Sequence, residues 1–223
     1  MNNWNGIASL FIACIELILL INVFIFAEKN KINFLVISII FLLMFYQAFE
    51  FIMCNLGLDS SFNAFWAFAD ISFLPPLGLY FVLTFYNYRS KYFVFIFLPA
   101  IAFVIYYSTI IEQFNVNACT VFYAIYKYPQ GDLYGLFYYT PVLVTMALLI
   151  HGIRKSPDER VVHLSKVLLT AYILISIPVV TAFVLALSDQ MLLVHSIVSV
   201  MCKFAVLLAV ALTYFALNKI GVK

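Results

Sequence analysis

Four ionisable residues lie inside long hydrophobic stretches of this chain, and they are the side chains best placed to do chemistry. They are one lysine in the last stretch and three carboxylates in earlier ones, namely Lys203, Glu16, Glu50 and Asp70. A charged group at membrane depth is costly, so such residues usually face the interior of a helix bundle and mark a functional site. The pattern therefore predicts a polar site inside a membrane protein.

Polar and aromatic side chains accompany these charges at helical spacing. They are Tyr46, Gln47 and Cys54 around Glu50, Trp66 four residues before Asp70, and His195 and Ser199 at four-residue steps before Lys203. Residues spaced in this way share one face of a helix, and a polar face packs against protein rather than lipid. We therefore expect these residues to converge in the bundle.

Two interpretations of this cluster remain open from the sequence. In the first, a pocket open to the outside binds a small ligand between the second, third and seventh stretches. In the second, Lys203 forms a buried ion pair with Glu50 or Asp70 that only fixes helix packing. Glu16 is expected to snorkel or to lie protonated against lipid, and His195 could equally serve helix packing.

Composition defines the class of protein. The 223 residues are 66% hydrophobic and only 10% charged, which predicts an all-α integral membrane protein rather than a soluble domain. Seven stretches approach the roughly 20 residues that a bilayer requires, at 7–27, 33–55, 63–86, 92–111, 134–153, 165–187 and 191–217. We expect one seven-helix domain over 1–223, a retained first span rather than a signal peptide, and the lipid bilayer as surroundings. The net charge of +2 gives no reason to expect nucleic acid as a partner.

Basic residues are distributed unevenly between the connecting loops. One set falls on a single side of the expected bundle: Lys29, Lys31, Arg89, Lys91, Arg154, Lys155, Arg160, Lys166, Lys219 and Lys223. Only Lys127 falls in a loop on the other side. Because cytoplasmic loops carry the excess of Lys and Arg, the N-terminus is predicted outside and the C-terminus in the cytoplasm.

The longest loop, 112–133, lies on the predicted outer side and is rich in tyrosine and phenylalanine. Its aromatic residues serve either as interfacial anchors or as a lid over an outward-opening cavity. Cys119 in this loop and Cys54 at the outer end of the second span are expected to form a disulfide in an oxidising compartment.

Enzymatic function is not expected. The sequence shows no nucleophile–base pair, no metal-ligand spacing and no phosphate-binding loop, so we predict no catalytic residues, no metal and no cofactor. A small proton-coupled transporter would use the carboxylates as coupling groups. The chain shows no internal repeat of the kind that many transporters contain.

Several short segments resemble the N-terminal seven-span sensor region of some bacterial histidine kinases. They include YQAFEF with Glu50, FLPPLGLYFVLTFYN, FLPAIAFVIYY, DLYGLFYYTP, LLIHGIRKSPDERVVHLSKVLL and ALTYFALNK, in that order. The resemblance implies a sensor or receptor-like protein of the bacterial inner membrane that binds an unidentified small ligand. Because no kinase follows, a cytoplasmic or membrane partner would carry the signal onward.

A second resemblance is to microbial rhodopsins. ADISFLPPLGL resembles their carboxylate-bearing third helix, with Asp70 in the place of the counterion and Pro76 in that of the helix proline. This resemblance implies retinal bound to Lys203 as a Schiff base, in a photoreceptor or ion pump. The chain departs from the pattern at Ser199, where those proteins usually have an acid, and by having no tryptophan within 165–187.

Overall fold

The computed structural model describes residues 4–88, 90–121, 124–127, 129–187 and 191–218, without the side chains of 115, 127, 132 and 182–201. Its described helices are α1 (Ile7–Phe26), α2 (Lys31–Asn55), α3 (Ser61–Ser72), α4 (Leu74–Phe85), η1 (Lys91–Phe97), α5 (Leu98–Ser108), η2 (Ile111–Gln113), α6 (Gly131–Lys155), α7 (Glu159–Leu187) and α8 (Met191–Leu217). Two strands, β1 (Asn115–Cys119) and β2 (Ala124–Lys127), form an antiparallel pair.

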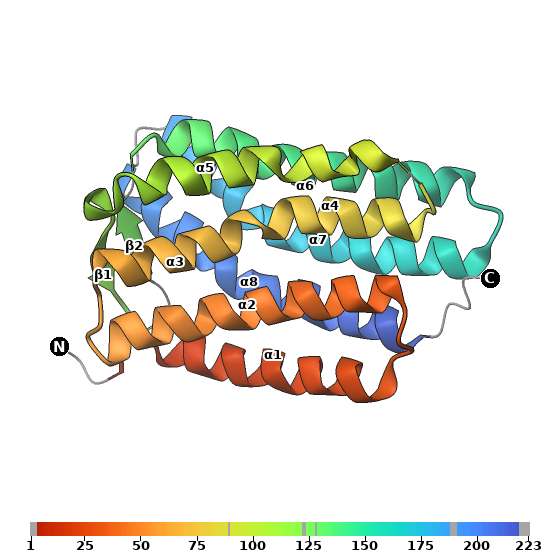
Figure 1. Ribbon diagram of the computed structural model, residues 1–223, viewed down its shortest axis with the longest axis horizontal. Coiled ribbons are helices and arrows are strands. Elements are labelled where there is room, and N and C mark those ends of the chain that lie inside the picture. Colours follow the sequence, from red (N-terminus) through yellow and green to blue (C-terminus); the bar gives the residue numbers. More distant parts are fainter. Residues whose placement is uncertain (1–3, 89, 122–123, 128, 188–190, 219–223) are drawn as a thin grey trace.

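The helices run side by side along the long axis of the molecule, and the strands lie at one end of the bundle (Figure 1). We call this the hairpin end. The opposite end, where the α1–α2 and α6–α7 connections lie, is here called the basic end. It carries Lys29, Lys31, Lys91, Arg154, Lys155, Arg160 and Lys166.

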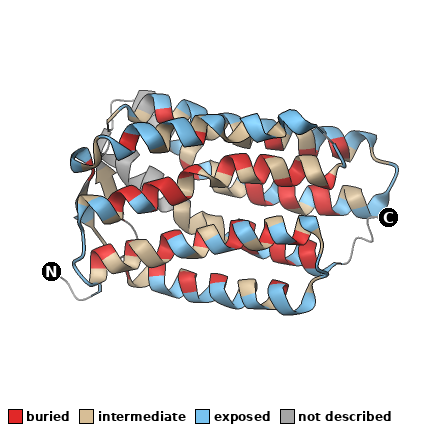
Figure 2. Ribbon diagram, viewed as in Figure 1, coloured by how far each residue is buried: buried red, intermediate tan, exposed pale blue. Residues whose placement is uncertain are grey.

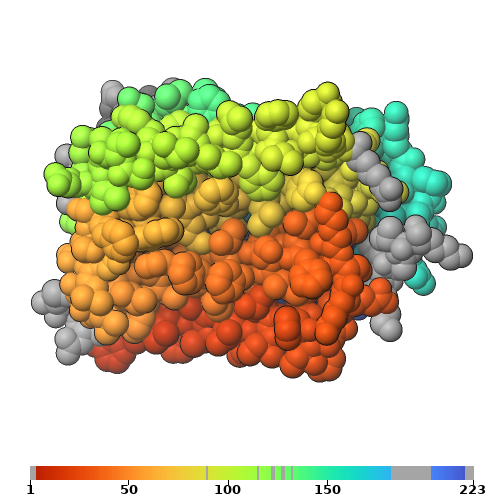
Figure 3. Space-filling model, viewed as in Figure 1, coloured from red at the N-terminus to blue at the C-terminus, as the bar shows by residue number. Residues whose placement is uncertain are grey.

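Six helical segments of the described chain are long and apolar enough to cross a membrane, in agreement with an α-helical multi-pass membrane protein. They are Ile7–Phe26, Lys31–Asn55, Ser61–Phe85, Lys91–Ser108, Leu133–Lys155 and Glu159–Thr181. In α8, the part whose side chains are described, Cys202–Leu217, is a shorter apolar helix. Large apolar side chains such as Phe11, Phe24 and Ile105 lie exposed on the outer faces, as expected for contact with lipid. Residues of α1 to α5 make up most of the face shown in Figure 3.

Prolines interrupt two of these segments. The third predicted span is divided into α3 and α4 at Phe73, directly before Pro75 and Pro76, because proline cannot donate the backbone hydrogen bond that a continuous helix needs. The fourth begins as the 3₁₀-helix η1 and becomes α-helical at Leu98, next to Pro99. Helices α6 and α7 continue through Pro141 and Pro178.

The hairpin is the element that differs from an all-helical expectation. Part of the predicted outer loop folds into β1 and β2, with an irregular register between Val116 and Ala118. Aromatic rings from before and after the hairpin pack on α3: Phe68 lies 4.7 Å from Tyr107, 5.3 Å from Phe114 and 4.4 Å from Tyr134, centroid to centroid. The hairpin is thus supported by an aromatic cluster rather than free in solvent.

The buried side chains form two clusters along the bundle. The cluster toward the basic end is mostly aliphatic, with Ile40, Leu168 and Leu212 among its members, and the cluster at the hairpin end is mostly aromatic. Buried positions concentrate on the inner faces of the helices (Figure 2). Polar residues are buried with them, and these include Ser9, Gln47 and Glu50.

Candidate functional site

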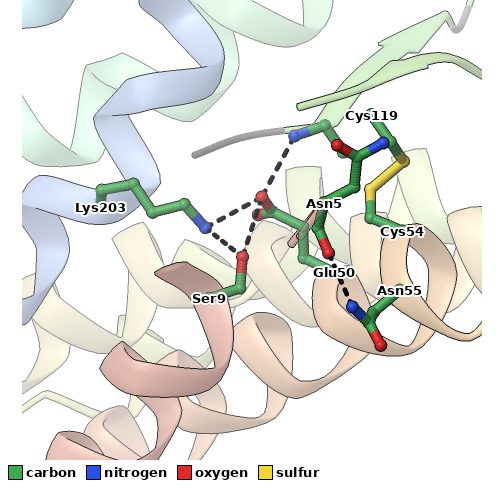
Figure 4. The surroundings of a disulfide bond; sticks show 8 residues. Asn5, Ser9, Glu50, Cys54, Asn55, Cys119 and Lys203 are labelled. Carbon is green, nitrogen blue, oxygen red and sulfur yellow. Dashed lines mark hydrogen bonds and ion pairs between the residues drawn. A yellow bond between two sulfur atoms is a disulfide. The ribbon is translucent and has the colours of Figure 1, made fainter. Parts of the chain in front are cut away.

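Lys203 and Glu50 form an ion pair in the interior of the hairpin end. Lys203 Nζ lies 2.9 Å from Glu50 Oε1, and their side chains are only 10% and 1% exposed. Figure 4 shows Lys203 extending from α8 between α1 and α2 toward the carboxylate. The structure thus answers the question left open by the sequence, because the described partner of Lys203 is Glu50 and not Asp70.

Every donor of the Lys203 ammonium has an acceptor. Besides Glu50, Nζ donates to Ser9 Oγ at 2.8 Å and to Gln47 Oε1 at 2.7 Å. Gln47 then donates through Nε2 to the Cys202 carbonyl at 2.8 Å, which ties α2 to α8 a second time. A buried charge is tolerated only when it is paired and hydrogen-bonded in this way.

One oxygen of Glu50 collects all of its described interactions. Oε1 accepts from Ser9 Oγ at 3.2 Å and from the Ala124 amide of β2 at 3.1 Å, in addition to Lys203. Oε2 is buried without a hydrogen-bond partner among the described residues. Glu50 is therefore the point where α1, α2, α8 and the hairpin meet.

A disulfide holds the hairpin over this ion pair. Cys54, one turn after Glu50, is bonded to Cys119 at the end of β1 (Figure 4). The N-terminal end of α1 adds backbone hydrogen bonds to the connection between the strands, from Gly6 N to Thr120 O and from Ala8 N to Val121 O. Gly6 has φ of 73° and a Cβ there would contact Cys54 Cβ at 3.0 Å, so only glycine suits this crossing.

The hairpin also brings a tyrosine to the site that the sequence did not indicate. Burial, together with the nearby Glu50 carboxylate, holds the pKa of the Tyr126 phenol on β2 well above its usual range. The described part of the outer loop therefore covers Glu50 through Ala124 and Tyr126 of β2.

Two of the predicted carboxylates are buried away from this ion pair. Glu16 is fully buried on the inner face of α1, so the expectation that it snorkels or faces lipid is wrong. It lies within electrostatic range of Lys203, yet neither of its oxygens has a hydrogen-bond partner among the described residues. Asp70 is 8% exposed and its Oδ2 also lacks a described partner. Asp70 belongs to α3, which packs on α2 and not primarily on α8.

The remaining predicted residues separate into three groups. Tyr46 is buried beside Gln47 on α2. Trp66 is 45% exposed and contacts Phe62 and Phe65 on its own helix, so its predicted place in the pocket is wrong. An amphipathic indole near a helix end suits the membrane interface instead. His195 and Ser199 lie outside the residues whose side chains are described.

A cavity lies next to the ion pair, deeper in the bundle. It has a volume of about 70 Å³ and is lined by residues of α2, α3, α4, α6, α7 and α8, among them Tyr46 and Cys202. Lys203 is not part of its described wall, because the lysine side chain turns toward α1 and α2. Within the described chain no group of three or more His, Cys, Asp or Glu residues could hold a metal ion.

No protein-family model, curated protein or solved structure matches this chain. The interpretation of the site therefore rests on its own residues.

Two members of the site, Ser9 and the Ala124 amide, were not predicted from the sequence. Ser9 lies seven residues before Glu16, so the two residues share a helix face two turns apart, and this spacing could have indicated that Ser9 faces the bundle interior. The Ala124 amide could not be found, because a backbone donor has no side-chain signature.

Proposed function

We propose that this chain is a seven-helix, receptor-like sensor in which a small ligand inside the bundle shifts the packing held by the Lys203–Glu50 ion pair. The observation that carries the proposal is that this one ion pair joins α1, α2 and α8 beneath a disulfide-bound cover. Separation of Lys203 from Glu50 would leave both charges buried without their partner, so a ligand that separates them would favour a different packing of these helices.

The topology supports a direction for the signal. The basic end carries an excess of lysine and arginine, so we place it in the cytoplasm, with α8 as the seventh span and the hairpin outside. The resemblance to kinase sensor regions favours a bacterial inner membrane. Helix α8 runs from beside the hairpin to the basic end (Figure 1). A change at Lys203 would therefore reach a partner protein at the cytoplasmic surface through α8.

Hydrogen exchange of the protein in lipid nanodiscs tests this proposal. Glu50→Gln removes the carboxylate charge opposite Lys203, and Glu112→Gln makes the same change on an exposed carboxylate at the same end. We expect Glu50→Gln to increase exchange at both the hairpin and the basic end of α8, and Glu112→Gln to leave both unchanged. Increased exchange confined to the hairpin would mean that the ion pair only holds the cover, and the sensor proposal would fail.

The retinal alternative has its own decisive measurement. The absorption spectrum of protein reconstituted with all-trans retinal should show no band that is red-shifted from free retinal, because Lys203 Nζ is engaged by Ser9, Gln47 and Glu50. A red-shifted band that is lost in Lys203→Ala would replace the sensor by a retinal protein.

A further inference from the structure

The cavity beside the ion pair has the properties of a ligand site. Its volume of about 70 Å³ is several times the roughly 10–15 Å³ that one water molecule needs. The space suits a molecule of one or two rings and is too small for a long lipid chain. It lies among four of the six long helical segments and α8, the usual location of binding sites in helix bundles.

The described wall of the cavity carries no charged side chain, so its chemistry favours an uncharged ligand. Most of the wall is aliphatic, and Tyr46, Tyr138, Tyr139 and Tyr172 add aromatic rings from three helices. Rings of this kind attract another aromatic ring through edge-to-face and offset contacts. The wall thus selects for a flat, apolar molecule.

One polar group on the wall, the Tyr172 hydroxyl, lies close to a glycine. The Tyr172 side chain is only 4% exposed and lines the cavity. A Cβ on Gly78 would overlap Tyr172 Oη, so glycine at 78 is what allows the hydroxyl to sit at this position. A tyrosine hydroxyl can both donate and accept a hydrogen bond. A ligand in the cavity with one polar atom would therefore pair with Tyr172.

The cavity is also connected to the ion pair. Tyr46 and Cys202 line it, and they directly precede Gln47 and Lys203 on α2 and α8. Gln47 donates to the carbonyl of Cys202 itself. A molecule that fills the cavity therefore presses on the same segments of α2 and α8 that hold Lys203 in place.

We propose that this cavity binds a small uncharged aromatic molecule with a single hydrogen-bonding group, of the phenol or indole class, and that Tyr172 is its polar contact. The inference rests on the proposed sensor function and assigns the location and chemical class of its ligand.

Binding of 4-fluorophenol, followed by ¹⁹F NMR of the protein in nanodiscs, tests the site. The matched probes are 4-fluorotoluene, which lacks the hydroxyl, and 4-fluorobenzoate, which is charged. We expect a saturable bound signal for 4-fluorophenol, about five-fold weaker affinity in Tyr172→Phe, equivalent to one neutral hydrogen bond, and no effect of that variant on 4-fluorotoluene. We expect no binding of 4-fluorobenzoate.

A second variant removes the space itself. Ala205→Leu fills the cavity from α8, and Ala102→Leu adds the same bulk on the exposed side of α5. Ala205→Leu should abolish the bound signal, whereas Ala102→Leu should preserve it. Partitioning of the probes into lipid is common to both variants and cannot produce the difference. Equal binding in the two leucine variants, or in wild type and Tyr172→Phe, would overturn the assignment.

The inference and the proposed function can fail separately. If 4-fluorophenol binds as described but leaves hydrogen exchange at the basic end of α8 unchanged, the site exists and the sensor proposal fails. If Glu50→Gln changes exchange at the basic end while none of the uncharged probes binds, the sensor proposal stands and the cavity is only a packing defect.

Discussion

At the hairpin end, a buried ion pair and a disulfide join residues that are far apart in the sequence, whereas the basic end is held by short connections, close packing and the hydrogen bond between Tyr86 and Ser165. Lys203 and Ser9 are bonded across 194 residues, and Cys54 and Cys119 across 65. At the basic end, the α1–α2 connection is stabilised by a local hydrogen bond. The side chain of Asn30 accepts from Asn33 N at 2.9 Å and caps the start of α2.

The packing at the basic end depends on shape. Tyr86, just after α4, donates to or accepts from Ser165 Oγ at 2.7 Å, and its ring occupies the space where a Cβ of residue 152 would lie. Polar networks respond to changes in charge, while close packing resists deformation. The comparison indicates a responsive hairpin end and a stiff basic end that transmits its movement.

Removal of the lysine charge should give the largest effect on stability. Lys203→Met leaves the Glu50 carboxylate buried without a cation, and loss of one partner of a buried pair typically costs about 3–5 kcal/mol. The measurement is the free energy of unfolding in mixed detergent micelles. Lys29→Met, at an exposed lysine of the basic end, is the control and should cost little.

The double variant Glu50→Gln/Lys203→Met sharpens this test. It removes both charges, so it should be more stable than Lys203→Met alone. If the single and double variants unfold with the same free energy, the ion pair is not what distinguishes the hairpin end.

Loss of the disulfide should be the next largest effect. Cys54→Ala/Cys119→Ala frees a closed loop of more than sixty residues, and loss of a disulfide typically costs about 2–4 kcal/mol. Wild type treated with reductant should match the variant, and the variant itself should not respond to reductant. Wild-type stability that is insensitive to reductant would show that α1 and the aromatic cluster hold the hairpin without the covalent link.

At the basic end, a single methyl group should disturb the packing. Gly152→Ala places a Cβ inside the Tyr86 ring position and should cost about 1–3 kcal/mol as an overpacking substitution. Gly135→Ala in the same helix meets nothing within 4 Å and should cost nothing. Adding Tyr86→Leu to Gly152→Ala should recover part of the loss. Equal stabilities of the two alanine variants would mean that the basic end is not tightly packed.

Much of the architecture could be predicted from hydrophobic runs, because length and apolar character directly reflect the bilayer. The second predicted span illustrates this, since 33–55 lies within the helix Lys31–Asn55, which is long and apolar enough to cross a membrane. The hairpin was not predicted, because its strands are only five and four residues long and depend on the disulfide and on Glu50 for support.

The site could be predicted only in part, for a similar reason. Spacing along one helix placed Gln47 with Glu50 correctly, since residues three apart share a face. Spacing cannot say which helices are neighbours, and this is why Asp70 could not be separated from Glu50 as the partner of Lys203. The prediction for Trp66 was wrong because an i, i+4 relation to a buried residue such as Asp70 does not by itself fix the burial of a side chain.

The smallest expected effect separates the polar network from its charges. Ser9→Ala removes one donor to Glu50 and one acceptor for Lys203 but leaves the ion pair itself, so the cost should be about 0.5–1.5 kcal/mol. Ser38→Ala on α2, whose hydroxyl bonds only the Phe34 carbonyl one turn before it, should change stability by less. In the Lys203→Met background the cost of Ser9→Ala should shrink, because the hydroxyl has then lost its cationic donor. An undiminished cost in that background would mean that Ser9 acts through α1 packing alone, and the hairpin end would then resemble the basic end in being held by shape.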